Sequence, residues 1–167
     1  MRNQLLLFFA ACTLALAGCG VYSFTGASIS PDIKTVSIKN FPNRAALIQP
    51  SLSITFTEKL RDKFVSQTNL RLVESDADLS FEGYISDYRT TPQAIQGNQT
   101  AALNRLTITV NVKFTNAKDP KQNFEVPFSR FADYDSQKNL TDVEIALIDE
   151  IDRQLVDDIF NKSVTNW

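Results

Sequence analysis

The sequence predicts an α+β fold, a two-layer α/β sandwich in which two helices pack on one face of a mixed β-sheet. Segments 52–64 and 143–159 carry apolar residues at every third or fourth position, which is typical of amphipathic helices. Several shorter segments alternate apolar and polar residues, which is typical of strands with one buried face. The order strand, helix, strands, helix favours two layers, because each helix must bury its apolar stripe on the sheet.

The first 18 residues are typical of a bacterial lipoprotein signal peptide. Arg2 is followed by an apolar run from Leu5 to Ala17, which is shorter than the ~20 apolar residues that a membrane-spanning helix needs. Leu16-Ala17-Gly18-Cys19 at the end of this run looks like a lipobox, the site where a lipoprotein is acylated and cleaved. An ordinary secretory signal that ends beside a cysteine is the alternative.

Acylation at Cys19 predicts a tethered domain. A diacylglyceryl group on the sulfur and a further chain such as palmitate on the amine hold a protein at a membrane surface, since each buried CH₂ contributes ~0.8 kcal/mol. We therefore expect a signal peptide over 1–18, a lipidated tether over 19–31 and a single α/β periplasmic domain over 32–167. After processing, neither Cys12 nor Cys19 is left to form a disulfide.

The domain is expected to begin with a strand and a helix. Residues 33–41 are expected to form a strand that ends at Pro42, because proline cannot continue a ladder of hydrogen bonds. A helix should start near Pro50, where the missing N–H costs nothing, and end near Gln67. Its apolar face consists of Leu52, Phe56, Leu60 and Phe64.

Two more strands and a long connection follow. Residues 70–73 and 79–86 are expected to be strands joined by a tight turn. The stretch 90–104 is uncharged and rich in Gln, Asn and Thr, with Arg89 and Arg105 at its ends. Because it is longer than most hairpin connections, it predicts a loop with a function or with mobility.

The last third is expected to hold a hairpin and the longest helix. Residues 106–115 show the strongest alternation, and a turn leads to a second strand at 124–128, which Pro127 places at a sheet edge or a bulge. Thr141-Asp142-Val143-Glu144 matches a capping box at a helix start. The helix then carries an apolar stripe, for which core burial is expected and a groove on a partner is the alternative. The stripe consists of Val143, Leu147, Ile148, Ile151, Leu155, Val156, Ile159 and Phe160.

Composition excludes several classes of function. The chain has 17 Lys and Arg against 19 Asp and Glu, and loss of the signal peptide removes one basic residue, so nucleic acid is not an expected partner. The chain has no histidine, and no free thiol is expected after processing, which excludes Ser-His-Asp and Cys-His catalysis and the usual zinc sites. The pairs Asp76/Asp78 and Asp133/Asp135 more ordinarily mark turns and strand ends. We expect no cofactor, no metal and no enzyme activity.

Four segments carry a resemblance to a known family. Residues 19–28, 34–41, 104–108 and 157–160 resemble segments of the LptE-type lipoproteins of Bacteroidetes. The resemblance implies an outer-membrane lipoprotein that faces the periplasm, plugs the LptD β-barrel and assists delivery of lipopolysaccharide to the cell surface. It carries over no individual lipopolysaccharide-contacting residue.

Candidate contacts come from charge and placement. A plug must present polar surface to a polar barrel lumen, and the 90–104 stretch and the Thr/Asn face of strand 106–114 could supply it. Lipid A phosphates favour arginine, whose planar fork matches phosphate oxygens. Arg89 and Arg105, expected to lie close together at the base of one hairpin, are the candidates, with Lys113 nearby. Ordinary solvated charge is the alternative for all three.

Two other functions are compatible with the sequence. The pattern from Ala77 to Gly83 also resembles strands of peptidoglycan-synthase activators and of curli-secretion lipoproteins, which predicts a periplasmic binding module of the synthase-activator or secretion type. A small carbohydrate-active enzyme that uses Asp76 and Asp78 belongs to a different class. It predicts turnover of a glycan that is lost when both aspartates become asparagine.

Overall fold

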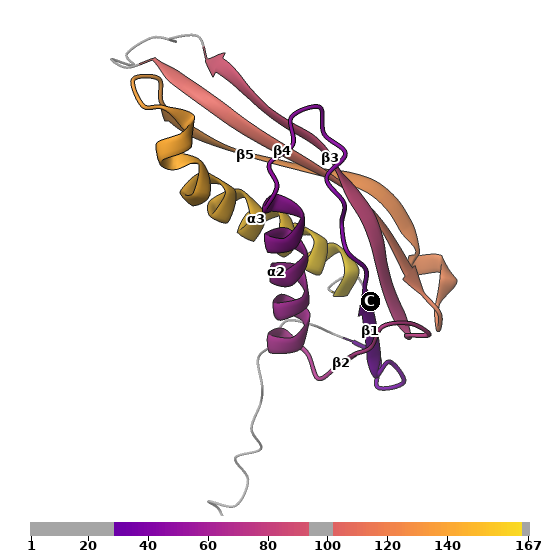
Figure 1. Ribbon diagram of the computed structural model, residues 1–167. Coiled ribbons are helices and arrows are strands. Elements are labelled where there is room, and N and C mark those ends of the chain that lie inside the picture. Colours follow the sequence, from indigo (N-terminus) through magenta and orange to yellow (C-terminus); the bar gives the residue numbers. More distant parts are fainter. Residues whose placement is uncertain (1–28, 94–101, 165–167) are drawn as a thin grey trace, which may run out of the picture.

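The structure is a computed structural model that describes residues 29–93 and 102–164. It contains a five-stranded mixed sheet with both helices on one face (Figure 1), so the predicted α+β class is confirmed. In chain order the elements are β1 (Thr35–Ile38), α2 (Leu52–Gln67), β2 (Arg71–Leu72), β3 (Leu79–Gln93), β4 (Leu103–Asn116), the 3-10 helix η2 (Pro120–Gln122), β5 (Phe124–Asp135) and α3 (Leu140–Val164).

The strands lie in the order β2-β1-β3-β4-β5. β1 pairs in parallel with β2 and β3, while β3, β4 and β5 pair antiparallel. β1 covers only residues 79–81 of β3. Further along, the Arg44 N–H donates to the Ile85 carbonyl at 2.8 Å, and the Ile85 N–H donates to the Pro42 carbonyl at 3.0 Å. The chain after β1 therefore continues the pairing on this side of β3.

The core lies between the helices and the sheet. The Phe64 ring of α2 has its centroid 4.8 Å from that of Phe81 in β3 and 5.1 Å from that of Phe160 in α3. Phe81 in turn lies 4.9 Å from Phe114 of β4. Four elements thus meet in one aromatic cluster. The apolar stripe of α3 faces this core, with Ile151 fully buried, so its core interpretation is confirmed.

Gly83 marks the closest packing on the inner face of β3. A Cβ atom added there would lie 2.0 Å from the Asn111 carbonyl oxygen and 2.6 Å from Cε1 of Phe41. Phe41 is itself fully buried. The ring of Phe41 therefore occupies the space that a side chain at position 83 would need.

The predicted loop over 90–104 is wrong at both ends. Residues 90–93 belong to β3 and 103–104 belong to β4, where they pair with each other and with β5. Their side chains are exposed or only partly buried, so no apolar alternation reveals these strand ends. The rest of that stretch, 94–101, lies outside the described residues.

β5 is longer than predicted and continues from residue 128 to Asp135. Arg130 interrupts the apolar alternation because its guanidinium reaches α3, where Nε and Nη2 donate to the Asp158 carboxylate at 2.5 and 2.7 Å. The register is unbroken across Pro127, and β5 is the last strand of the sheet. Of the two predicted alternatives for Pro127, the edge position is the one observed.

The start of α3 also differs from the prediction. The helix begins at Leu140, so Thr141 lies within the first turn and does not cap it. Glu144 accepts a hydrogen bond from the Tyr88 hydroxyl and so ties α3 to β3. Burial and this carboxylate raise the pKa of Tyr88, which keeps the hydroxyl protonated as the donor.

Asp78 fastens the turn before β3 to β1. Its Oδ2 accepts hydrogen bonds from the Lys34 N–H at 2.9 Å, the Thr35 N–H at 3.1 Å and the Thr35 hydroxyl at 3.0 Å. Lys118 Nζ lies 3.2 Å from Oδ1. The bond from Lys34 is the largest cause that lowers the pKa of Asp78, to about 2. Asp76, two residues earlier, has a φ of 53°, a left-handed conformation that asparagine and aspartate tolerate in turns.

Ile151→Asp should prevent cooperative folding. Loss of the buried side chain costs roughly 2–5 kcal/mol and a buried carboxylate adds a desolvation cost, against a total stability of ~5–15 kcal/mol. Ile145→Asp is the matched control, because Ile145 lies on the same helix with 81% of its surface exposed, and it should change stability by less than ~0.5 kcal/mol. Thermal unfolding followed by circular dichroism measures both. Equal melting temperatures for the two variants would contradict the core position of Ile151.

Asp78→Asn should lower stability at neutral pH by roughly 1–3 kcal/mol, because charge-assisted hydrogen bonds become neutral ones. Since folding lowers the pKa of Asp78 from 3.8 to about 2, its contribution is present above pH ~4 and is lost as the pH falls toward about 2. Urea unfolding from pH 7 to pH 2 should show the difference between parent and variant shrinking over that lower window only. Asp76→Asn is the control, and a matching loss in that variant would show that Asp78 has no special role.

Candidate functional site

The sheet face turned away from α2 and α3 is here called the outer face. Near its distal end, where β3 ends and β4 begins, directly paired residues of β3, β4 and β5 form three rows of three. Side chains that lie directly opposite each other in antiparallel strands point to the same face. The nine residues, called the outer grid, are Asp87, Thr109 and Ser129 in the first row, Arg89, Thr107 and Phe131 in the second, and Thr91, Arg105 and Asp133 in the third.

Arg105 makes the strongest contacts in the outer grid. Its Nε and Nη2 donate to the two carboxylate oxygens of Asp133 at 2.7 and 2.8 Å. Its guanidinium carbon lies 3.6 Å from the centroid of the Phe131 ring. The hydrogen bonds from Arg105 lower the pKa of Asp133 and raise that of Arg105 itself. Both side chains are therefore charged at neutral pH, and together they carry no net charge.

The rest of the outer grid is polar and balanced in charge. Arg89 forms an ion pair with Asp87 on its own strand. Thr109 donates its hydroxyl hydrogen to Ser129 Oγ at 3.0 Å. Phe131, with 47% of its surface exposed, is the large apolar side chain on this patch. Two cations, two anions and several hydroxyls make this a neutral hydrogen-bonding surface, not a basic patch.

The structure brings together two of the three predicted contact residues. Arg89 pairs with Thr107 and Arg105 pairs with Thr91, so the two arginines are diagonal neighbours on the outer face, as expected. Lys113 lies eight positions from Arg105 along β4, about 26 Å away at 3.3 Å per residue. The prediction that Lys113 lies near the arginines is therefore wrong.

The surroundings of Lys113 differ as well. It pairs across the sheet with Glu82 of β3 and Glu125 of β5, so an acidic residue stands on each side of it. Cys19, the predicted site of lipid attachment, lies outside the described residues.

Asp133 is the contact residue that the sequence did not reveal. Its partner Arg105 lies 28 positions earlier in the chain, and only the register between β4 and β5 brings the two together. Asp135, the other member of this acidic pair, accepts a hydrogen bond from the Gln137 N–H at 2.8 Å. Asp133 and Asp78 thus each bind specific partners within the domain. Neither acidic pair provides two free carboxylates for catalysis.

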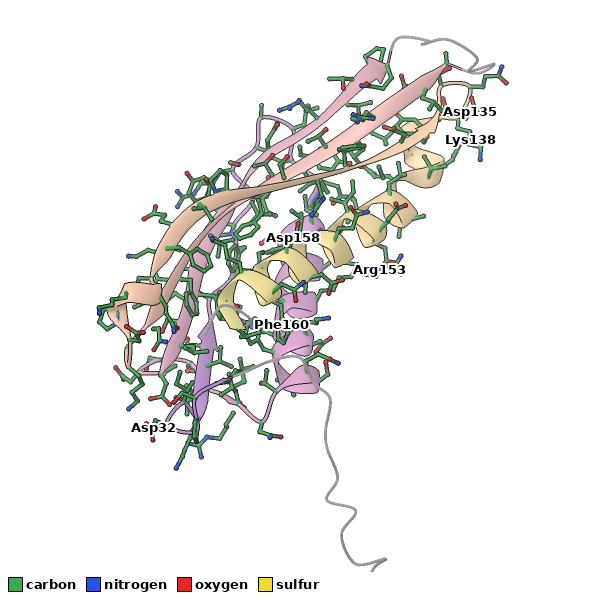
Figure 2. The ribbon with its side chains drawn as sticks, turned by 180° about the vertical axis from the view of Figure 1, so that it is seen from behind. Asp32, Asp135, Lys138, Arg153, Asp158 and Phe160 are labelled. Carbon is green, nitrogen blue, oxygen red and sulfur yellow. The ribbon has the colours of Figure 1, made fainter. Side chains whose placement is uncertain are left out.

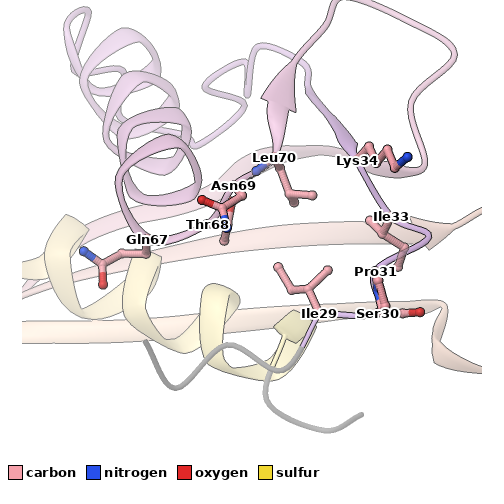
Figure 3. A pocket seen from close by; sticks show the side chains of 9 residues that line it. All are labelled: Ile29, Ser30, Pro31, Ile33, Lys34, Gln67, Thr68, Asn69 and Leu70. Atoms are coloured by element: carbon pink, nitrogen blue, oxygen red, sulfur yellow. Dashed lines mark hydrogen bonds between the residues drawn. The ribbon is translucent and has the colours of Figure 1, made fainter. Parts of the chain in front are cut away.

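A cleft of about 310 Å³ lies at the opposite end of the domain from the outer grid. It opens between residues 29–34 and residues 67–70 at the end of α2 (Figure 3). Figure 2 shows Asp32 at this end of the molecule and Asp135 with Lys138 at the other end. Lys34 is the one charged residue among those that line the cleft. The N-terminal side of the described chain thus enters the domain far from the outer grid.

Within residues 29–93 and 102–164, no three His, Cys, Asp or Glu side chains gather closely enough to hold a metal ion. None of the helices in these ranges is long and apolar enough to cross a membrane. The outer grid is the candidate site for contact with a partner.

Several solved structures of other proteins are similar to this chain. A hypothetical protein from Chlamydia trachomatis is similar with a TM-score of 0.50 and 11% identity, covering 80% of this chain and 99% of that chain. A minor lipoprotein from Acinetobacter baumannii has a TM-score of 0.46 and 14% identity, covering 80% and 97% of the two chains. Lipoprotein B from Nitrosomonas europaea has a TM-score of 0.49 and 13% identity, covering 86% and 88%. At 11% identity, the similarity to the Chlamydia trachomatis protein shows a shared fold and nothing about function.

Sequence comparison gives a more specific result. None of the curated proteins matches the chain. The model of a family described as LptE, lipopolysaccharide-assembly, matches residues 33–163. This match spans all five strands, α2 and nearly all of α3. The chain therefore belongs to the LptE lipopolysaccharide-assembly family.

Proposed function

We propose that this protein is a lipid-anchored outer-membrane lipoprotein that faces the periplasm and assists lipopolysaccharide assembly by seating in an LptD-type β-barrel. Family membership supports the role in lipopolysaccharide assembly. The outer grid is the observation that supports barrel contact. It is a neutral, hydrogen-bonding surface that neither α2 nor α3 covers, and the lumen of a barrel of this kind is polar. The role is one of binding, without catalysis or a cofactor.

The two ends of the domain suit such a role. Signal peptide removal at 1–18 and acylation of Cys19 would leave a tether over 19–31 that reaches the domain at the cleft end. The outer grid lies at the other end of the sheet. A protein held at the membrane through Cys19 then directs the outer grid away from its own point of attachment, toward a partner.

Within this proposal, Arg89 and Arg105 are the groups placed to meet lipid A phosphates. Arg89 is the freer of the two, because 57% of its side chain is exposed and its partner Asp87 lies on the same strand. An exposed ion pair of this kind is worth only ~0–1 kcal/mol, so a phosphate can replace the aspartate. Lys113, flanked by Glu82 and Glu125, is the weaker candidate for contact with a partner.

Removing the charge pair of the outer grid should weaken the barrel complex. In the double variant Arg105→Gln/Asp133→Asn no charge is left unpaired, so the melting temperature should change by no more than a few degrees. Copurification of the outer-membrane barrel with the acylated protein should fall at least several-fold.

Arg89→Gln, measured in the same preparation, should instead lower binding to lipopolysaccharide vesicles and leave the barrel bound.

The matched control is Arg130→Gln/Asp158→Asn. That pair has the same two-pronged geometry, with distances of 2.5 and 2.7 Å, but it joins β5 to α3 on the inner side of the sheet. Since this double variant also leaves no charge unpaired, its melting temperature should change by no more than a few degrees, and the barrel should stay bound. Equal barrel recovery with both double variants would place the contact surface elsewhere. Recovery of a peptidoglycan synthase in place of a barrel would favour the synthase-activator function.

Cys19→Ala should release a folded protein from the membrane, or leave it unprocessed, because the acyl chains act on location and not on the core. Membrane fractionation followed by thermal unfolding of the recovered protein measures both effects. The parent protein, and a Cys12→Ala variant within the expected signal peptide, are the controls. Tight membrane association of the Cys19→Ala variant would contradict the lipid anchor.

A further inference from the structure

Asp152 of α3 has a carboxylate with no visible partner. The residue is fully buried, and within the described part of the chain neither of its side-chain oxygens has a hydrogen-bond partner. Buried carboxylates are normally paired or hydrogen-bonded, because burial of an uncompensated charge is costly. Since nothing in the outer grid or the cleft involves Asp152, its placement needs another explanation.

The groups that face Asp152 from α2 already have other partners. Lys59 Nζ binds the Asp149 carboxylate at 2.5 Å and the Asp149 backbone carbonyl at 3.2 Å. The Thr55 hydroxyl is directed at backbone carbonyl oxygens one turn earlier, at 3.1 and 3.2 Å. The Lys59 ammonium thus acts on the buried carboxyl group from a distance while it is bound to Asp149. The Thr55 hydroxyl lies close enough to lower the pKa of Asp152, but its short hydrogen bonds go to the backbone.

The same holds for the charged groups on the other sides of α3. Arg130 of β5 is bound to Asp158, and Tyr88 of β3 is bound to Glu144. The open groove between α2 and α3 contains two further cations, of which Lys63 pairs with Asp157 and Arg153 with Asp149. Figure 2 shows Arg153 and Asp158 on different sides of the helix. Each of these cations is thus bound to an acid other than Asp152.

Burial is the main cause that raises the pKa of Asp152, to about 7. Lys59 and the Thr55 hydroxyl oppose this shift, and Asp149 adds to it. Near neutral pH the carboxyl group therefore exists in both protonation states. The seam between α2 and α3 has to accommodate a neutral acid in one state and a buried anion in the other.

We propose that Asp152 is a proton-operated switch at the seam between α2 and α3. With Asp152 protonated, Lys59 pairs with Asp149 and the two helices are closed on each other, as in the structure. With Asp152 ionised, the Lys59 ammonium turns inward to the buried carboxylate and Asp149 is released. The seam is then less stable, because the buried anion has lost its hydration. The switch lies on the helix side of the sheet, opposite the outer grid, so it does not depend on the proposed function.

The sign of the pH dependence follows from the raised pKa. A carboxyl group that binds its proton more tightly when folded contributes stability below its unfolded pKa of about 4, and this is lost as the pH rises through its folded pKa of about 7. Asp152→Asn keeps the shape and cannot ionise. The variant should gain in melting temperature relative to the parent by roughly 5 °C or more between pH 5 and pH 8.

Glu150→Gln is the matched control, because Glu150 is an exposed acid on the same helix. Its difference from the parent should not change with pH. A pH-independent difference for Asp152→Asn as well would overturn the proposal, because the carboxyl group would then not change its protonation state over this range.

The part played by Lys59 is tested by carboxyl carbon NMR of the full-length protein, with the Asp152 signal assigned through its loss in Asp152→Asn. Lys59→Met keeps the apolar stem and removes the charge, so the titration midpoint of Asp152 should move to higher pH. Asp149→Asn frees Lys59 for Asp152, so the midpoint should move to lower pH. Unchanged midpoints in both variants would show that Lys59 does not move between the two acids and would overturn the switch. This measurement stands even if Asp152→Asn proves unstable, because the Asp152 carboxyl signal can also be assigned in the parent protein by through-bond correlation with its own backbone.

Discussion

The antiparallel pairing of β3 with β4 is the constraint on which the remaining structure depends. It sets the centre of the sheet, with β1 on one side and β5 on the other. A register shift between Ile85 and Asp87 changes which side chains face the core. Before the shift Leu79, Phe81 and Ile85 of β3 are buried; after it, Tyr88 is buried and Arg89 is exposed. Without that extra residue Arg89 would point at the helices, and the outer grid would not form.

The sequence predicted the elements whose apolar residues meet the core. The period of two in β4 and the period near 3.6 in α3 both follow from burial of their apolar residues in the hydrophobic core. It did not predict residues 90–93 as strand, because both faces of β3 are polar there. The second half of β5 was not predicted for a related reason. Arg130 lies at a core-facing position, where its guanidinium donates to Asp158 of α3. Asp78 looked like an ordinary turn residue because its partner Thr35 lies 43 positions away.

Only the part of the candidate site that lies on one hairpin could be predicted from the sequence. Arg89 and Arg105 flank a single connection between two strands, so their proximity follows from the chain itself. The partnership of Arg105 with Asp133 requires the register of a third strand, which local sequence does not fix. The error over Lys113 has a simple geometric cause. Eight residues of strand cover more distance than the same number in a helix, at 3.3 Å against 1.5 Å per residue.

Pro127 has a consequence for how copies of this protein behave when crowded together. It lies within the last strand of the sheet, in an unbroken register. Because proline has no N–H to give to β4, its nitrogen faces the open side, where it interrupts the row of unpaired donors. A strand from another molecule could therefore not form a continuous ladder of hydrogen bonds along β5. The charged residues Glu125 and Arg130 lie near the interruption. Pro127 thus opposes edge-to-edge polymerisation through β5, a strand at the edge of the sheet.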